Sequence, residues 1–207
     1  MKSRPIAQFI LLWGKGRCGK TTVASQLVET INRDLSRSPY TARSYQLSFS
    51  YPLKQALRLF WPQIDWNTLT SKDKEQYRPF MTSIADAVKA IYPHYFARSL
   101  VTNTERILSH NNQNYSQTIF VIDDLRFIEE LYILEGTGYP LTVVNIGNSL
   151  TNQTTSNSSQ KSSDKHNSEQ HFGLANITNI WWINNLTKNE GSKLLEHLVS
   201  NNAICLD

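Results

Sequence analysis

The chain has 207 residues, a length that fits one domain with an inserted segment and allows a sizeable single core. Apolar residues make up 40% of it, charged residues 18%, and the formal net charge is +4, which excludes a disordered or fibrous chain and suits an anionic ligand. No apolar run reaches the roughly 18 to 20 residues that cross a bilayer and no run of five basic residues occurs, so we expect a cytoplasmic protein with neither a membrane nor a nucleic acid as partner.

Buried apolar runs alternate with segments of helical period, which predicts an α/β sheet covered by helices. The run QFILLW predicts a first, fully buried strand, and the segment from about Lys20 to Arg33 predicts a helix. The alternating stretch RSYQLSF predicts a second strand that ends near Ser50. Pro52 then stands where a first-turn proline belongs, at the start of an amphipathic helix with the sequence PLKQALRLFW.

The middle of the chain, from Pro62 to about His110, holds no strand-like run. Two patterns there, YRPFMTSIADAVKAIY and HYFARSLVTNTERILSH, predict two helices separated near Pro93. The next run, TIFVID, predicts a short buried strand, followed by a helix from about Phe127 to Glu135 and another strand at LTVVNI. A final strand is expected at NIWWIN, and a C-terminal helix at NLTKNEGSKLLEHLVS.

The segment from Gly147 to Gly173 is almost wholly polar. Its composition alone favours a flexible linker. A long irregular segment between two strands of one sheet is unusual, however, unless it is functional or disordered. A lid that closes over a ligand is therefore the alternative interpretation.

The stretch from Gly14 to Thr21 matches the phosphate-binding pattern GxxxxGK(S/T), and it follows a buried strand and opens a helix, as that pattern requires. Its backbone N–H groups and the helix dipole favour an anion. We expect Lys20 to reach the β and γ phosphates of ATP, and the Thr21 hydroxyl to bind Mg²⁺. The predicted ATP-binding residues are Gly14, Lys15, Gly16, Arg17, Cys18, Gly19, Lys20, Thr21 and Thr22.

The same loop is one residue away from KGGxGKTT, the variant used by partition-type dimeric ATPases, in which a lysine at the place of Lys15 reaches the partner's nucleotide. Arg17 replaces the second glycine of that variant, and the segment LSFSYPLKQ supplies no acidic residue after the second strand. A molecular switch of this class therefore remains only as an alternative function.

The third predicted strand ends in a polar cluster that contains Asp123, Asp124 and Arg126. Ligands of open parallel sheets bind beyond the carboxyl ends of the strands, so this cluster should face the phosphate loop. An aspartate there can hold Mg²⁺, and an arginine can clamp a phosphate. We assign the metal to Thr21 and Asp123, with Asp124 as the other candidate, and catalysis to Lys20, Arg126 and Asp124. A surface turn with a helix cap is the alternative.

The order of GKGRCGKTT, SYPLKQAL, YRPFM, HYFARSL, DLRFIEE and KSSDKHNSE resembles the bacteriophage deoxynucleoside monophosphate kinases, within the P-loop nucleoside monophosphate kinase superfamily. The resemblance implies a single three-layer α/β domain over residues 1–207, with a parallel sheet of about five strands. Its core would comprise residues 6–50 and 117–207, its helical acceptor-binding region about 51–112, and its lid about 147–173. The implied reaction moves the γ-phosphoryl group of ATP, with Mg²⁺, onto a deoxynucleoside monophosphate, in a monomer or homodimer.

The resemblance also implies further site residues. The acceptor would contact Lys54, Arg78, Arg98, Asp124, Arg126 and Glu130, and the lid would contribute Lys161, Asp164, His166, Ser168 and Glu169. The chain departs from the family pattern because it has no arginine after Arg126, so the cations that we expect the lid to offer are Lys161, Lys165 and His166. We expect Arg126, with Arg17, Arg78 or Arg98, to supply the planar clamp. Another small-molecule kinase, of the dephospho-coenzyme A or phosphomevalonate type, would share this scaffold and differ in its acceptor pocket.

Overall fold

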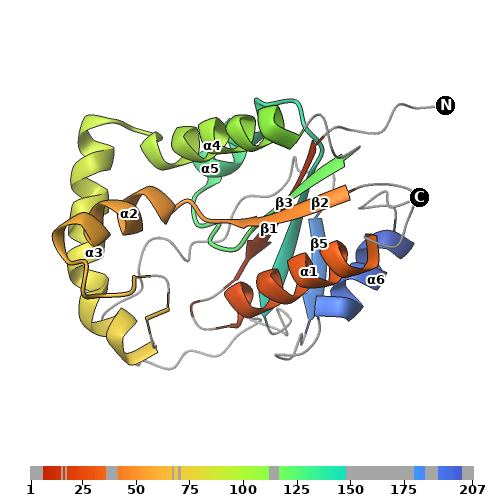
Figure 1. Cartoon of the computed structure of the whole chain (residues 1–207), viewed down its shortest axis with the longest axis horizontal. Helices are drawn as coiled ribbons and strands as arrows, with labels where there is room; N and C mark the ends of the chain where they lie inside the picture. Colours follow the sequence, from red (N-terminus) through yellow and green to blue (C-terminus); the bar gives the residue numbers. More distant parts are fainter. Residues whose placement is uncertain are drawn as a thin grey trace, which may run out of the picture.

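Five parallel strands form a single sheet in the computed structural model, in the order β2-β3-β1-β4-β5 (Figure 1). The strands are β1 (Ala7–Trp13), β2 (Ala42–Leu47), β3 (Gln117–Ile122), β4 (Leu141–Gly147) and β5 (Ile180–Asn184). The structure describes residues 7–14, 16, 18–35, 42–66, 68–69, 71–111, 117–147, 180–184 and 191–201. The predicted fold class, a three-layer α/β fold with a parallel five-stranded sheet, is confirmed.

Helices cover both faces of the sheet (Figure 1). The core on one face is completed by α1 (Lys20–Leu35) and α6 (Gly191–Ser200), and the core on the other face by α4 (Tyr95–Asn111) and α5 (Ile128–Glu135). The central strand β1 supplies both cores, because Phe9 and Leu11 face one side and Ile10 and Leu12 face the other. A strand buried on both faces needs an uninterrupted apolar run, which explains the sequence QFILLW.

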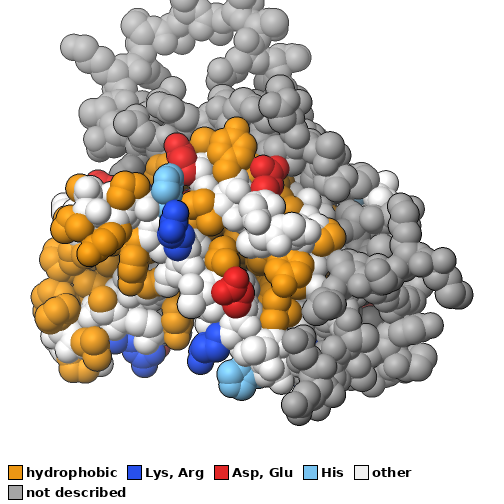
Figure 2. Space-filling view, turned by 90° about the horizontal axis from the view of Figure 1, so that it is seen from above, with side chains coloured by type: hydrophobic (Ala, Val, Ile, Leu, Met, Phe, Trp, Pro, Cys, Tyr) orange, Lys and Arg blue, Asp and Glu red, His pale blue; other side chains and the backbone are white. Residues whose placement is uncertain are grey.

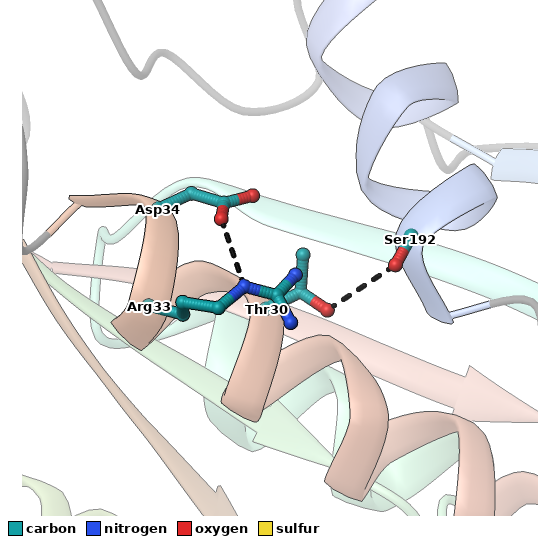
Figure 3. A network of polar contacts seen from close by, with 4 residues as sticks. All are labelled: Thr30, Arg33, Asp34 and Ser192. Carbon is teal, nitrogen blue, oxygen red and sulfur yellow. Dashed lines mark hydrogen bonds and ion pairs between the residues drawn. The ribbon is translucent and has the colours of Figure 1, made fainter.

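The helices α1 and α6 pack closely although they lie far apart in the sequence. A Cβ on Gly191 would collide with Gln26, and the Gly191 N–H donates a 3.2 Å hydrogen bond to Gln26 Oε1. Figure 3 shows the neighbouring contact, in which the hydroxyls of Thr30 and Ser192 lie 3.5 Å apart. The residue at the start of α6 is therefore a glycine because a side chain would push the two helices apart.

Two further helices follow β2, namely α2 (Tyr51–Phe60) and α3 (Ser71–Ile91). Ser50 is the N-cap of α2, and Pro52 lies in its first turn, as the sequence predicted. The helix α3 begins six residues before Tyr77, where the predicted helical pattern begins. The sequence pattern did not predict these first turns, because they are polar and carry no apolar period. The strand β2 is shorter than predicted and ends at Leu47, since the following residues turn toward Asp124.

The segment between α3 and α4 contains Pro93 and His94. His94, directly before α4, has a positive φ of 70° where the chain turns from one helix to the other. Among the described residues between β2 and β3, the structure has helices and loops and no strand. None of the helices within the described ranges is both long and apolar enough to cross a membrane. The lid residues Lys161, Asp164, His166, Ser168 and Glu169 lie outside the described residues.

Candidate active site

The phosphate loop joins β1 to α1 and depends on two glycines with positive φ. Gly14 has a φ of 151° and Gly19 a φ of 92°, and a Cβ on Gly14 would collide with the carbonyl oxygen of Ile146. The ammonium group of Lys20 is directed back into the loop, where it donates a 2.7 Å hydrogen bond to the Gly14 carbonyl and lies 3.6 Å from Cys18 Sγ. Lys15 and Arg17 lie outside the described residues.

Thr21 and Asp123 meet at the carboxyl edge of the sheet. Thr21 is in the first turn of α1, Asp123 directly follows β3, and the Thr21 side chain hydrogen-bonds the Asp123 carboxylate. Gln46 Nε2 donates a second hydrogen bond to Asp123 Oδ2 at 2.9 Å. Burial raises the pKa of Asp123 above its usual value, the neighbouring Asp124 carboxylate raises it further, and Lys54 opposes the rise.

This pair of side chains suits a divalent cation. A hydroxyl and a carboxylate are oxygen ligands of the kind that Mg²⁺ prefers, and a bound cation would favour the ionised form of Asp123. Within the described ranges no cluster of three or more acidic, histidine or cysteine side chains could hold a metal on its own. A magnesium ion at Thr21 and Asp123 would therefore take its other ligands from phosphate oxygens and water.

The carboxylate of Asp124 accepts hydrogen bonds from the loop between β2 and α2. Its Oδ1 accepts the Phe49 N–H at 2.8 Å, and its Oδ2 accepts the Ser50 N–H at 3.0 Å and the Ser48 hydroxyl at 2.7 Å. Of the two candidate metal ligands, Asp123 is the one that contacts Thr21. The predicted contacts of Asp124 with the acceptor or the metal stay predictions, while its visible role is to hold this loop.

Asp124→Asn should destabilise the fold. In the wild type both carboxylate oxygens accept hydrogen bonds, whereas in the variant an amide nitrogen, itself a donor, would face a backbone N–H donor. We expect the free energy of unfolding to fall by about 2–4 kcal/mol, because hydrogen bonds to a charged group contribute about 1.5–3 kcal/mol each. Urea unfolding measures the loss, and Asp34→Asn, at an exposed site on α1, is the control. Unchanged stability together with a large loss of kcat would assign Asp124 to the reaction instead.

Glu130 closes the first turn of α5. Its Oε2 accepts the N–H groups of Arg126 at 2.9 Å and Phe127 at 3.1 Å, so the Glu130 side chain caps the start of this helix, with Phe127 at the N-cap. The side chain is buried, and this burial raises the pKa of Glu130 to about 7 despite the two hydrogen bonds. The helix cap considered as an alternative for the Asp-x-Arg segment is thus present, and it fixes the backbone of Arg126.

Glu130→Gln should remove a pH dependence of stability while keeping the cap, because the amide oxygen can still accept both N–H groups. The unfolded chain loses this proton near pH 4.5 and the folded chain near pH 7, so the wild type loses stability as the pH rises between these values. The wild type should lose about 3 kcal/mol relative to the variant across this window. Urea unfolding at pH 5 and pH 8 tests this, with the exposed neighbour Glu129→Gln as control. A difference between variant and wild type that stays constant with pH would contradict it.

Two cavities meet at Thr21, Ser48, Lys54 and Asp123. The smaller one, of about 260 Å³, lies between the β2–α2 loop, α3 and the β3–α5 loop. Four cationic side chains line it: Lys54, Arg78, Lys89 and Arg126. The larger one, of about 1190 Å³, contains Arg98. The structure therefore brings Lys54, Arg78 and Arg126 together and places Arg98 elsewhere.

Lys89 is a candidate site residue that the sequence patterns did not indicate. Its ammonium group lies 3.8 Å from the centre of the Phe127 ring and close enough to Glu130 to lower the pKa of that carboxyl. Arg78, Thr82, Ala85 and Lys89 all line the smaller cavity and follow a spacing of three or four residues. A helical period counted from Arg78 along α3 would have found Lys89.

Comparison with known proteins adds three findings. A family model described as phosphomevalonate kinase matches residues 12–138, which include the phosphate loop and the segment after β3. A solved structure of a cysteine-to-alanine mutant of the APS kinase CysC from Mycobacterium tuberculosis aligns at 14% identity, over 94% of this chain and 99% of that chain, with a TM-score of 0.39. No curated protein sequence matches the chain.

Proposed function

The chain belongs to the phosphomevalonate kinase family, and on this premise we propose that it moves the γ-phosphoryl group of ATP onto the phosphate group of a small phosphorylated molecule, with phosphomevalonate as the first candidate acceptor. The protein is thus a small-molecule P-loop kinase, and the partition-type ATPase alternative is set aside. The observation that carries the proposal is the cavity of about 260 Å³ beside Thr21 and Asp123, lined by four cationic side chains.

The charges of this cavity fit an anionic acceptor. Its cations come from three elements, with Lys54 on α2, Arg78 and Lys89 on α3, and Arg126 before α5. Three carboxyl groups, of Asp123, Asp124 and Glu130, line the same cavity, and the raised pKa of Glu130, about 7, reduces the negative charge that opposes the cations. Such a set can bind a phosphate and still hold a second anionic group, such as the carboxylate of phosphomevalonate.

The volume of the cavity favours a compact acceptor. Pockets for drug-sized ligands measure about 300–1,000 Å³, and this one measures about 260 Å³. A specific observation keeps a deoxynucleoside monophosphate as the second candidate, because the partly exposed aromatic ring of Phe127 lines the same cavity and can contact a base. The acceptor that the resemblance to the bacteriophage kinases implies, a deoxynucleoside monophosphate, is thus the second candidate, and phosphomevalonate is the first.

The phosphate loop fits the phosphates of ATP. Gly14 and Gly19 open the backbone where side chains would obstruct it, and Lys20 already points into the loop. Thr21 and Asp123 would hold Mg²⁺, which when bound neutralises charge on the phosphate oxygens. ATP and Mg²⁺ are accordingly the proposed cosubstrate and metal.

The proposed roles of the residues follow from their positions. Phosphoryl transfer asks the protein mainly for alignment and for positive charge around the transferring group. Lys20 approaches that group from the phosphate loop and Arg126 from the end of β3, while Lys54 lies between the donor and acceptor sides. Asp124 and Glu130 hold the loops that carry these cations. No side chain has to form a covalent bond.

A coupled assay of ADP release identifies the acceptor. The panel contains phosphomevalonate, unphosphorylated mevalonate, deoxy- and ribonucleoside monophosphates, and a reaction without acceptor. We expect turnover with phosphomevalonate and none with mevalonate, because the receiving atom is a phosphate oxygen. Turnover with deoxynucleoside monophosphates alone would select the second candidate, and a uniformly flat panel would overturn the proposal. Arg78→Ala should raise the KM of the true acceptor about tenfold or more and leave the KM of ATP unchanged.

A further inference from the structure

The larger cavity, of about 1190 Å³, adjoins the proposed reaction site at Thr21, Lys54 and Asp123, and its other lining residues have no role in the proposed reaction. It lies beside the edge strand β2 and is bounded by the start of α2, the α3–α4 junction and one face of α4. It meets the smaller cavity only at Thr21, Ser48, Lys54 and Asp123, and its volume is more than four times as large. A phosphorylated acceptor bound in the smaller cavity would leave it empty.

The face of α4 that lines this cavity is polar and cationic. Arg98, Thr102 and Arg106 follow one another at intervals of four residues, so they form one ridge along the helix. The two arginines are about 12 Å apart along the axis, from a rise of about 1.5 Å per residue. Their guanidinium groups and Lys54 face a single lining carboxylate, that of Asp123. The charge balance of the cavity favours an anion.

The mouth of the cavity is aromatic and exposed. Tyr51 is 51% exposed, Tyr92 66% and Tyr95 42%, and Ile91 beside them is 71% exposed. In the space-filling view, apolar side chains gather at the end of the molecule that holds α3 (Figure 2). Three tyrosine rings near arginines offer flat surfaces for a planar ring and hydroxyls for polar groups.

We propose that this larger cavity is a second ligand site, which adjoins the reaction site at Thr21 and Asp123 and extends from there along α4, and that it binds an anion carrying a planar aromatic ring, of the nucleoside phosphate class. The ring stacks against Tyr51, Tyr92 or Tyr95, and the phosphates bind to Arg98 and Arg106 on α4. The inner wall of Leu47, Leu100 and Ile107 adds apolar contact. This site does not depend on which acceptor the enzyme uses.

Calorimetric titration with ADP tests the site. We expect two ADP molecules per chain in the wild type, one at the phosphate loop and one in the larger cavity. Tyr92→Ala/Arg106→Ala should weaken only the second by at least tenfold, since it removes a stacking ring and a phosphate clamp at the surface. The matched control is Arg58→Ala/Tyr132→Ala, which removes the same two residue types from exposed positions on α2 and α5 that line neither cavity.

Each outcome decides the question. One ADP per chain in the wild type would overturn the site. A second ADP that survives in Tyr92→Ala/Arg106→Ala but is lost in Arg78→Ala would place that nucleotide in the acceptor cavity, which also overturns the site. Thermal unfolding confirms that the variants are folded, and an unchanged kcat in Tyr92→Ala/Arg106→Ala separates this site from the reaction. The proposed kinase function stands or fails separately, in the acceptor panel.

Discussion

Lys20→Ala should lower kcat by about 10²–10³-fold, the range for removing one preorganised donor from a developing charge. Lys20 is the cation that the phosphate loop itself supplies, and its ammonium group already lies 2.7 Å from the Gly14 carbonyl oxygen, inside the loop that would hold the phosphates. Its charge therefore needs little rearrangement to meet the transferring group. Steady-state kinetics at saturating ATP and acceptor measures the loss.

The fold should tolerate this substitution. The variant loses the hydrogen bond to the Gly14 carbonyl, which costs about 1 kcal/mol at a partly buried position, and the weaker contact with Cys18 Sγ. Lys193→Ala, at an exposed position on α6, is the matched control and should keep wild-type turnover. A Lys20→Ala enzyme that remains within threefold of the wild-type kcat would show that Lys20 does not stabilise the reaction.

Arg126→Lys should lower kcat by about 10²-fold although it keeps the positive charge. A lysine cannot reproduce the planar fork that binds two phosphate oxygens together. The backbone of Arg126 is fixed by Glu130, while its side chain is exposed and lines the smaller cavity, the proposed acceptor site. Since the sequence offers no arginine after Arg126, no later residue can replace this fork. Arg126→Ala should cost about 10³-fold.

The comparison of the two Arg126 variants separates geometry from charge. If charge alone matters, the lysine variant will match the wild type at saturating substrates and the alanine variant will not. Arg58→Lys, on the exposed side of α2, controls for a general effect of the exchange. Arg126→Lys turnover equal to that of the wild type would remove Arg126 from the clamp.

Most elements of the fold were predictable because local patterns decide them. The runs QFILLW, TIFVID and LTVVNI became β1, β3 and β4, since central strands of a parallel sheet are apolar on both faces. The errors concern element ends. The polar start of α3 has no apolar period, and β2 stops where the carboxylate of Asp124 captures the loop, which depends on a residue more than seventy positions away.

The candidate site was only partly predictable. The phosphate loop is contiguous, so its glycines and Lys20 follow from one motif. The smaller cavity is assembled from α2, α3 and the β3–α5 loop, and the sequence does not show which arginines share a cavity. The sequence predicts the same role for Arg78 and Arg98, yet the two side chains line different cavities. Lys89 lines the same cavity as Arg78, because the two residues lie on one face of α3. Pairing of this kind requires the three-dimensional arrangement of the helices.

The contact between Gly14 and Ile146 has a consequence for protein engineering. Gly14 directly follows β1, Ile146 belongs to the adjacent strand β4, and no side chain fits between them. Ile146 is also the last residue before Gly147, where the long polar segment begins. A chimera that exchanges this segment with that of a related kinase should therefore be joined after Gly147. A junction placed within β4 would replace the wall against which the phosphate loop is built.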